Sequence, residues 1–256
     1  MNYKFKTENM TKETLEKMKK MRLLGMARAF HSSLESGKTA SMTTDQMINF
    51  LITSEWDDRQ NRSIERQIRN ARFRYQANVE DIYYNGDRNL DRNLMERFAE
   101  CTFLEKHENV LITGSTGIGK SYIASALGHQ ACSKGYKVFY ANIAKLFAKL
   151  KMAKADGSYI KELARIERQD LLIIDDFGLQ PLDNQNRSAL MEIIEDRHGK
   201  SSVIITSQVP VHLWYDIIGE KTIADAILDR IVHDAHRVEL CGESLRNKKN
   251  RMNNLN

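Results

Sequence analysis

An eight-residue loop near the middle of the chain constrains the fold more than any other stretch. Its residues are Gly114, Ser115, Thr116, Gly117, Ile118, Gly119, Lys120 and Ser121. Their spacing, G-x-x-x-x-G-K-[ST], is typical of a loop that holds nucleotide phosphates between a strand and a helix. The apolar run 109–113 before the loop and the helix-compatible run 121–128 after it supply that context. The pattern therefore predicts an α/β domain built around a nucleotide site.

Each residue type in this loop has a chemical reason. Glycine adopts backbone angles that a side chain forbids, so the loop amides can turn inward around phosphate oxygens at a helix N-terminus. Lys120 is expected to reach the β- and γ-phosphates, and the Ser121 hydroxyl to hold Mg²⁺. The residues predicted to bind the nucleotide are Gly114, Ser115, Thr116, Gly117, Ile118, Gly119, Lys120, Ser121 and Tyr122. The alternative is a chance match in a glycine turn, which the flanking strand and helix disfavour.

A second stretch carries two neighbouring carboxylates. Residues 170–176 form an apolar run that ends in Asp175 and Asp176, as expected for a buried strand of a parallel sheet. Open α/β sheets bind their ligands at the carboxyl ends of such strands. Asp175 is therefore predicted to hold Mg²⁺ through water, and Asp176 to polarise the water that attacks ATP. Two solvated acids in a turn are a poor alternative, because adjacent carboxylates near a core need a cation.

Composition narrows the class of protein. The chain has 256 residues, 41% of them hydrophobic, and a formal net charge of +5, which mildly favours a polyanionic partner. Its three cysteines, Cys101, Cys132 and Cys241, are far apart and are expected to be free thiols. Neither a signal peptide nor an apolar run of about 20 residues is apparent, so we expect a cytoplasmic protein without a membrane span.

The first part of the chain has helical periodicity. Residues 1–74 are predicted to form a small helical domain, followed by a connector, 75–108. We expect Gly25 to mark a bend between two helices, and Thr44 or Asp45 to cap a later helix.

Strands and helices alternate after residue 108. The expected strands are 109–113, 137–142, 170–175, 202–206 and 237–240. This alternation predicts a five-stranded parallel sheet with helices on both faces, over residues 109–246. A polar tail, 247–256, follows it.

Two basic helices are candidates for contacts with DNA phosphates. In the first, we expect Glu65 to be the only acid close to a run of six arginines, which are Arg59, Arg62, Arg66, Arg69, Arg72 and Arg74. In the second, apolar residues alternate with Lys145, Lys149, Lys151 and Lys154. Lysine and arginine at helical spacing suit a phosphate backbone, and Arg62, Arg66 and Arg69 lie near one face. A solvated helix face explains either pattern equally well, and pairing with acids elsewhere in the chain is a further alternative for the arginines.

The fourth strand ends in polar residues. Thr206, Ser207 and Gln208 are expected beside the γ-phosphate, where they can orient water. Ordinary hydrogen bonding at a strand end is the alternative.

These motifs resemble those of a known family. The phosphate loop, the acid pair, the polar strand end and the segment 224–230 resemble the AAA+ ATPases of the DnaA/DnaC/IstB group. The N-terminal segments 23–27, 55–62 and 71–77 resemble IstB, the helper ATPase of bacterial insertion sequences. The resemblance extends from about residue 12 to residue 246.

The sequence departs from this family at a few positions. Ser115 stands where proline is frequent, and Gln208 stands where asparagine is usual, so we assign the sensor role to Thr206 and Ser207. We expect the helical lid of many AAA+ proteins and its sensor arginine to be absent, with Arg246 only a weak substitute.

The resemblance implies a biological role. It implies an ATPase that uses ATP and Mg²⁺, forms ATP-dependent homo-oligomers on duplex DNA and helps an IstA-like transposase engage its target. Arg230 resembles the arginine finger of this group, although a salt bridge to Asp225 or Asp229 is the alternative. A DnaC-like helicase loader and a small-molecule kinase are the competing functions, and the kinase leaves the arginine-rich N-terminus unexplained.

Overall fold

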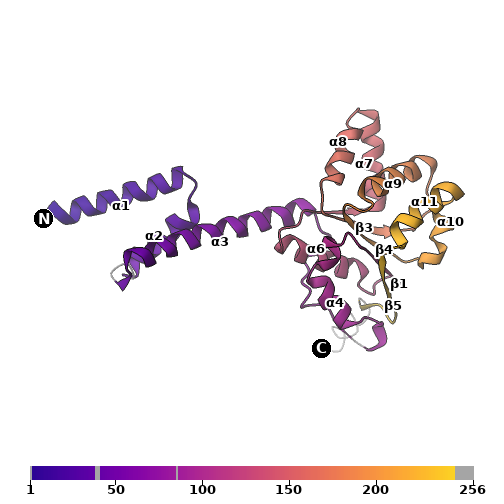
Figure 1. The fold of residues 1–256 in the computed structure, drawn as a ribbon, viewed down its shortest axis with the longest axis horizontal. Coiled ribbons are helices and arrows are strands. Elements are labelled where there is room, and N and C mark those ends of the chain that lie inside the picture. The colour runs from indigo at the N-terminus through magenta and orange to yellow at the C-terminus, as the bar shows by residue number, and fades with distance from the viewer. Residues whose placement is uncertain (1, 38–40, 85, 246–256) are drawn as a thin grey trace, which may run out of the picture. The chain divides into compact units, whose positions relative to one another are not determined.

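The computed structural model describes residues 2–37, 41–84 and 86–245. Arg246 and the expected tail, 247–256, lie outside the described residues. The chain divides into two compact units, Met1–Arg66 and Gln67–Asn256 (Figure 1). The boundary expected after Arg74 therefore lies inside the second unit.

The first unit is helical, as predicted. It contains α1 (Asn2–Lys20), α2 (Leu24–Glu35) and the first part of α3 (Thr44–Ala71). The prediction that Gly25 bends the chain was wrong, because the break between α1 and α2 precedes it, at residues 21–23. Gly25 instead lies in the first turn of α2, where an added Cβ would sit 2.4 Å from the Ser54 carbonyl oxygen. Its missing side chain lets α2 approach α3 closely.

The start of α3 is capped one residue earlier than expected. The Thr43 amide donates to the Gln46 side chain (2.9 Å), and the Gln46 amide donates to the Thr43 hydroxyl (3.3 Å). This reciprocal pair is a capping box, which satisfies two backbone donors at once. Thr43 therefore caps the helix, rather than Thr44 or Asp45.

The second unit contains all five predicted strands in one parallel sheet. They are β1 (Asn109–Gly114), β2 (Val138–Asn142), β3 (Leu171–Phe177), β4 (Ser202–Ser207) and β5 (Ala235–Leu240). Their order across the sheet is β2-β3-β4-β1-β5. The helices of this unit are α4 (Arg92–Ala99), α5 (Thr102–Glu105), α6 (Lys120–Ser133), α7 (Ile143–Ala155), α8 (Tyr159–Glu167), α9 (Asn184–Arg197), α10 (Trp214–Ile218) and α11 (Lys221–Val232), with short 3₁₀ turns at Gly86–Arg88 and Val211–Leu213.

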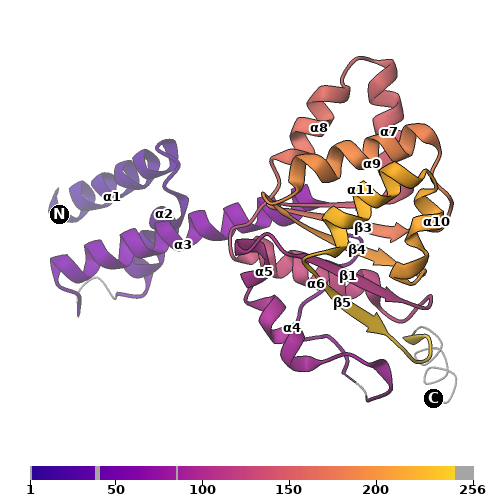
Figure 2. The same ribbon diagram turned by 45° about the vertical axis from the view of Figure 1, so that its right-hand side comes forward.

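Helices cover both faces of the sheet (Figure 2). Val110 and Ile112 of β1 pack on the face that carries α4 and α6. Leu111, between them, packs on the face that carries α7, α9 and α11. Alternate side chains of a strand point to opposite faces, so a strand buried on both sides is apolar over most of its length, with polar residues confined to its ends. The predicted apolar runs therefore became the inner strands.

The strand order decides which loops meet. β4 lies between β1 and β3, so the loops after β1 and β3 flank the end of β4 at the carboxyl edge of the sheet. The glycine loop and the acid pair, far apart in sequence, are thereby brought to one place. Of the helices that the structure describes, none combines the length and the apolar character needed to cross a membrane.

A glycine in α6 provides a test of this packing. Alanine is normally favoured over glycine in a helix by about 1 kcal/mol. At Gly128, however, an added Cβ would lie 2.4 Å from Phe73 and 2.8 Å from Ile173. We expect Gly128→Ala to lower the free energy of unfolding by about 1–3 kcal/mol, measured by chemical denaturation. The control is Ser133→Ala on the exposed end of α6, which should be neutral or slightly stabilising; equal effects of the two changes would contradict the packing argument.

Candidate nucleotide-binding site

The glycine loop is held from two sides. The Leu245 amide donates to the Gly117 carbonyl (3.0 Å), and an added Cβ at Gly117 would lie 2.2 Å from the Ser244 hydroxyl. The buried guanidinium of Arg88 donates to the Ile118 carbonyl (2.6 Å). The connector and the segment after β5 therefore fix the loop, two supports that local sequence patterns did not indicate.

Lys120, the first residue of α6, closes the loop. Its ammonium donates to the carbonyls of Gly114 (2.7 Å) and Ser115 (2.8 Å), and the residue is only 6% exposed. Burial lowers the pKa of Lys120, whereas the nearby carboxylates of Asp176 and Asp175 oppose that shift. The lysine thus places a positive charge at the mouth of the loop.

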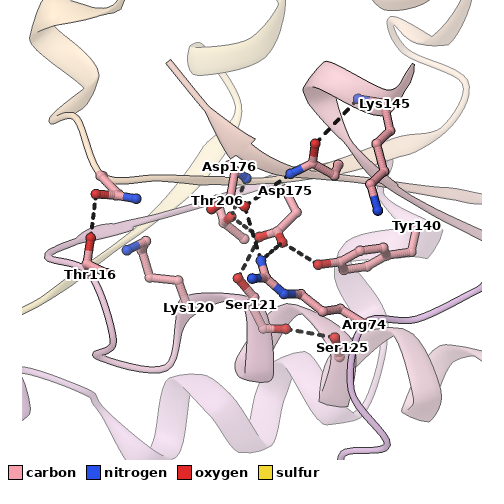
Figure 3. Close-up of polar contacts among 12 residues, drawn as sticks. Arg74, Thr116, Lys120, Ser121, Ser125, Tyr140, Lys145, Asp175, Asp176 and Thr206 are labelled. Carbon is pink, nitrogen blue, oxygen red and sulfur yellow. Dashed lines mark hydrogen bonds and ion pairs between the residues drawn. The ribbon is translucent and has the colours of Figure 1, made fainter. Parts of the chain in front are cut away.

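Asp175 is completely buried and surrounded by donors (Figure 3). Its carboxylate accepts hydrogen bonds from the hydroxyls of Ser121 (2.7 Å), Thr206 and Tyr140 and from the guanidinium of Arg74 (3.1 Å). Burial by itself raises the pKa of Asp175, but these four donors outweigh it and hold the pKa below its ordinary value. The buried carboxylate therefore remains ionised at neutral pH.

Asp176 adopts a left-handed backbone conformation, with φ of 62°. The β3–β4 register is irregular between Ile174 and Phe177, so the strand no longer alternates there. The Asp176 carboxylate accepts hydrogen bonds from the side-chain amide of Asn142 (3.1 Å) and from the guanidinium of Arg74 (3.1 Å). The irregular backbone thereby presents the second carboxylate to the cavity beside the first.

Arg74 is a site residue that the sequence analysis did not identify. It was grouped with arginines that face a DNA backbone, but its guanidinium forms ion pairs with both Asp175 and Asp176 (3.1 Å each). Adjacent acids near a core call for a cation, which was the available signal. Which of the chain's many cations would supply it depends on the path of the segment after α3.

The polar residues at the end of β4 have different hydrogen-bond partners. Thr206 donates to Asp175 and accepts from the Asp176 amide (3.2 Å). Ser207 donates to the Phe177 carbonyl (2.7 Å), so its hydroxyl serves the backbone. Gln208, which the sequence analysis set aside, accepts from the Thr116 hydroxyl (2.5 Å) and lines the cavity.

These elements enclose a cavity of about 410 Å³. It is lined by Arg74, Tyr75, Thr116, Gly117, Gly119, Lys120, Ser121, Tyr122, Asp176, Leu179, Gln208 and Leu245. This volume lies within the usual range for small-molecule sites. The lining combines loop amides, one buried ammonium and carboxylate oxygens, the groups that a metal–nucleotide complex requires.

The donors here fit a magnesium ion. The Ser121 hydroxyl, Asp175 and Asp176 supply hard oxygen ligands, which Mg²⁺ prefers, and Mg²⁺ is typically bound by one or two carboxylates together with phosphates and water. Over residues 2–37, 41–84 and 86–245, no group of three or more His, Cys, Asp or Glu side chains is arranged to hold a metal. A metal here would therefore take water or the phosphates of the nucleotide as further ligands.

Arg230 lies far from this cavity. It is near the C-terminal end of α11, where its backbone carbonyl accepts from Asn109 (3.2 Å) at the start of β1. The glycine loop follows the other end of β1, about 17–20 Å away at about 3.3 Å per residue. The Arg230 guanidinium pairs with Glu195 of α9 (2.7 Å), rather than with Asp225 or Asp229. It lines a separate cavity of about 380 Å³.

The lysines of α7 have different surroundings. Lys145 and Lys151 are exposed, whereas Lys149 forms an ion pair with Glu162 and the Lys154 ammonium lies 4.5 Å from the centre of the Tyr159 ring. The apolar residues behind them are buried, so α7 is amphipathic, as predicted.

The arginines of α3 have more acidic neighbours than expected. Arg62 pairs with Asp58 (2.7 Å) and lies 3.7 Å from Glu55. Glu65 is therefore not the sole nearby acid, because helical residues four positions apart are neighbours. Arg66 and Arg69 are exposed.

Comparisons with known proteins agree with this geometry. Residues 16–253 match the family model of IstB-like ATP binding proteins. The chain is 44% identical over 238 residues to the insertion sequence ATP-binding protein y4pL of Sinorhizobium fredii, covering 93% of this chain and 97% of that protein.

Two solved structures share the fold. The DnaC helicase loader superposes with a TM-score of 0.55 and 21% identity, covering 65% of this chain and 97% of that one. DnaA from Aquifex aeolicus, bound to AMPPCP, superposes with a TM-score of 0.58 and 17% identity, covering 72% and 57%. The predicted AAA+ fold with a preceding helical region is thus confirmed.

Lys120 provides the first test of the site. We expect Lys120→Ala to weaken ATP binding at least about 100-fold, because the phosphates lose a charge-assisted donor in a partly buried site. Binding of a fluorescent ATP analogue measures the effect. Lys134→Ala, at an exposed lysine just after α6, is the matched control and should bind like the wild type. Wild-type affinity in Lys120→Ala would contradict the assignment.

Proposed function

This chain belongs to the family of IstB-like ATP-binding proteins, and on that premise we propose that it is a magnesium-dependent ATPase that assembles on duplex DNA and helps an IstA-like transposase engage target DNA. One observation carries the ATPase assignment. Lys120, Ser121 and Asp176 line one cavity at the carboxyl edge of the sheet, and Asp175 lies directly behind it, where it accepts a hydrogen bond from Ser121. These are the groups that phosphoryl transfer to water requires.

Each residue has a distinct task in hydrolysis. Lys120 neutralises charge on the phosphates. Ser121 and Asp175 would hold the Mg²⁺, which would supply further positive charge to the phosphate oxygens. Asp176 is the partly exposed carboxylate of the pair, at 20% for its side chain, so it can accept a hydrogen bond from the attacking water. Thr206 holds the backbone amide of Asp176 and thereby sets its position.

Oligomer formation is supported by the position of Arg230. Because the sheet separates this arginine from the glycine loop of its own chain, it can reach only a nucleotide held by another subunit. Its side chain is 24% exposed and forms an ion pair with Glu195, so the guanidinium must leave this carboxylate to reach a neighbouring subunit. We therefore propose that Arg230 acts across a subunit boundary as an arginine finger.

DNA binding is proposed for the basic face of α7. Lys145 and Lys151 are exposed there, and Lys149 is adjacent to them. The exposed arginines of α3, Arg66 and Arg69, form a second candidate patch. The net charge of +5 favours such a polyanionic partner.

Transposition is favoured over helicase loading. The insertion-sequence relative matches over 93% of this chain, including the helical N-terminal part, whereas the helicase loader shares only the fold of 65%. Capture of a purified IstA-like transposase, but not of a replicative helicase, is the expected result of a pull-down. Capture of the helicase alone would favour the loader.

Hydrolysis and its subunit arrangement can be tested together. Asp176→Asn should bind ATP but lose hydrolysis by at least about 100-fold, because the amide cannot polarise water. Arg230→Ala should also bind ATP and lose DNA-dependent hydrolysis by about 10³-fold or more. Phosphate release with and without duplex DNA measures both.

Mixing the two inactive variants should restore part of the activity, because some interfaces then pair an intact acid with an intact arginine. Absence of rescue would contradict the action of Arg230 across subunits.

If the basic face of α7 contacts DNA phosphates, duplex binding must depend on salt concentration through its lysines. Replacing Lys145, Lys149 and Lys151 together by alanine should weaken duplex binding without regard to sequence. The slope of log affinity against log salt should fall by about one for each lost phosphate contact. The control removes the same charge from exposed residues elsewhere, Lys134, Lys137 and Lys200. Equal slopes for both triple variants would show that α7 is only a solvated face. Adding Arg66→Ala and Arg69→Ala to the α7 variant and measuring the same slope tests the second patch.

A further inference from the structure

Arg74 occupies the position where a cation is required. One of its terminal nitrogens, Nη1, lies 3.1 Å from an oxygen of Asp175 and 3.1 Å from an oxygen of Asp176 (Figure 3). Asp175 also binds the Ser121 hydroxyl, so the arginine stands beside the oxygen donors that suit Mg²⁺. A single guanidinium nitrogen thus bridges the acid pair.

No other cation of the described part of the chain forms an ion pair with this acid pair. The Lys120 ammonium is hydrogen-bonded to two carbonyls of the glycine loop instead. Asp175 is completely buried, and a buried carboxylate without a counter-charge is costly. Arg74 therefore adds the counter-charge that the three hydroxyl donors to Asp175 do not carry, before a metal–nucleotide complex arrives.

The Arg74 guanidinium also has room to move away from the two carboxylates. Its side chain is 42% exposed, in contrast to the buried acid it contacts. It lines both the nucleotide cavity and a neighbouring cavity of about 650 Å³, in which Arg72, Lys145 and Lys149 also lie. The guanidinium therefore has open space on two sides, without any need to disturb the core.

We propose that Arg74 is a built-in counter-cation that takes the place of the metal in the nucleotide-free protein and yields the acid pair when Mg²⁺ binds with ATP. This inference rests on the proposed function of the same site. Arginine brings one positive charge and Mg²⁺ brings two, so the exchange makes the site better suited to the triphosphate. The same arginine also lets the site accept a nucleotide without metal, because it offsets the repulsion between the phosphates and the two acids.

Two opposite effects follow from removing Arg74. A divalent cation no longer has to displace a resident charge, so the nucleotide-free protein should bind it more tightly. A metal-free nucleotide meets two uncompensated carboxylates, so it should bind more weakly. An arginine that only held the segment after α3 in place would produce neither pattern, since loosening the site weakens both ligands together.

The experiment measures both affinities on the full chain. Mn²⁺ binding to the nucleotide-free protein is followed by electron paramagnetic resonance, and binding of a fluorescent ATP analogue is followed in EDTA. For Arg74→Ala we expect Mn²⁺ to bind at least about tenfold more tightly and the metal-free analogue at least about tenfold more weakly. Arg74→Lys keeps the charge and should move both values back toward the wild type.

Arg72→Ala is the matched control. Arg72 belongs to the same segment and is exposed, and within the described ranges it has no ion pair, so its removal should leave both affinities unchanged. If the two affinities of Arg74→Ala stay at the wild-type values, or if they change in the same direction, the proposal is wrong. Failure of the proposed function looks different, since the wild type would then bind no Mg²⁺–ATP and release no phosphate.

Discussion

Neutralising two adjacent carboxylates is the constraint on which the site depends. Asp175 is completely buried and Asp176 follows it directly, and leaving such a charge unpaired costs several kcal/mol. The protein meets this need with donors from separate elements: Ser121 of α6, Tyr140 of β2, Thr206 of β4 and Arg74 from the segment after α3. The result is a carboxylate that stays ionised in the core, which is the condition for holding a metal.

The parallel sheet places these donors and also separates the two halves of the proposed chemistry. Parallel strands bring all their carboxyl ends to one edge, and the order β3-β4-β1 sets the acid pair, Thr206 and the glycine loop next to one another. The amino edge holds Arg230, one strand length away. Arg230 therefore lies a strand length from the glycine loop of its own chain, as the proposed action across a subunit boundary requires.

Much of this was predictable because the signals were local. Apolar runs predicted the inner strands, because a strand buried on both faces is apolar over most of its length, and an alternating pattern predicted β5, which lies at an edge of the sheet. The spacing of the glycine loop predicted Lys120 and Ser121 at a helix start, and α7 is amphipathic as its periodicity indicated. The errors were also local: Gly25 permits close packing of two helices instead of a bend, and Thr43 rather than Thr44 caps α3 because Gln46 completes the box.

By itself, the sequence determined the strand and helix types, the phosphate loop and the presence of two acids that required a cation. Those properties depend on short-range periodicity and on the chemistry of consecutive residues. Only the tertiary structure decided which cation neutralises the acids and that Gln208 rather than Ser207 lines the cavity. Such pairings depend on where distant segments and long flexible side chains meet in space, and no spacing along the chain encodes that meeting.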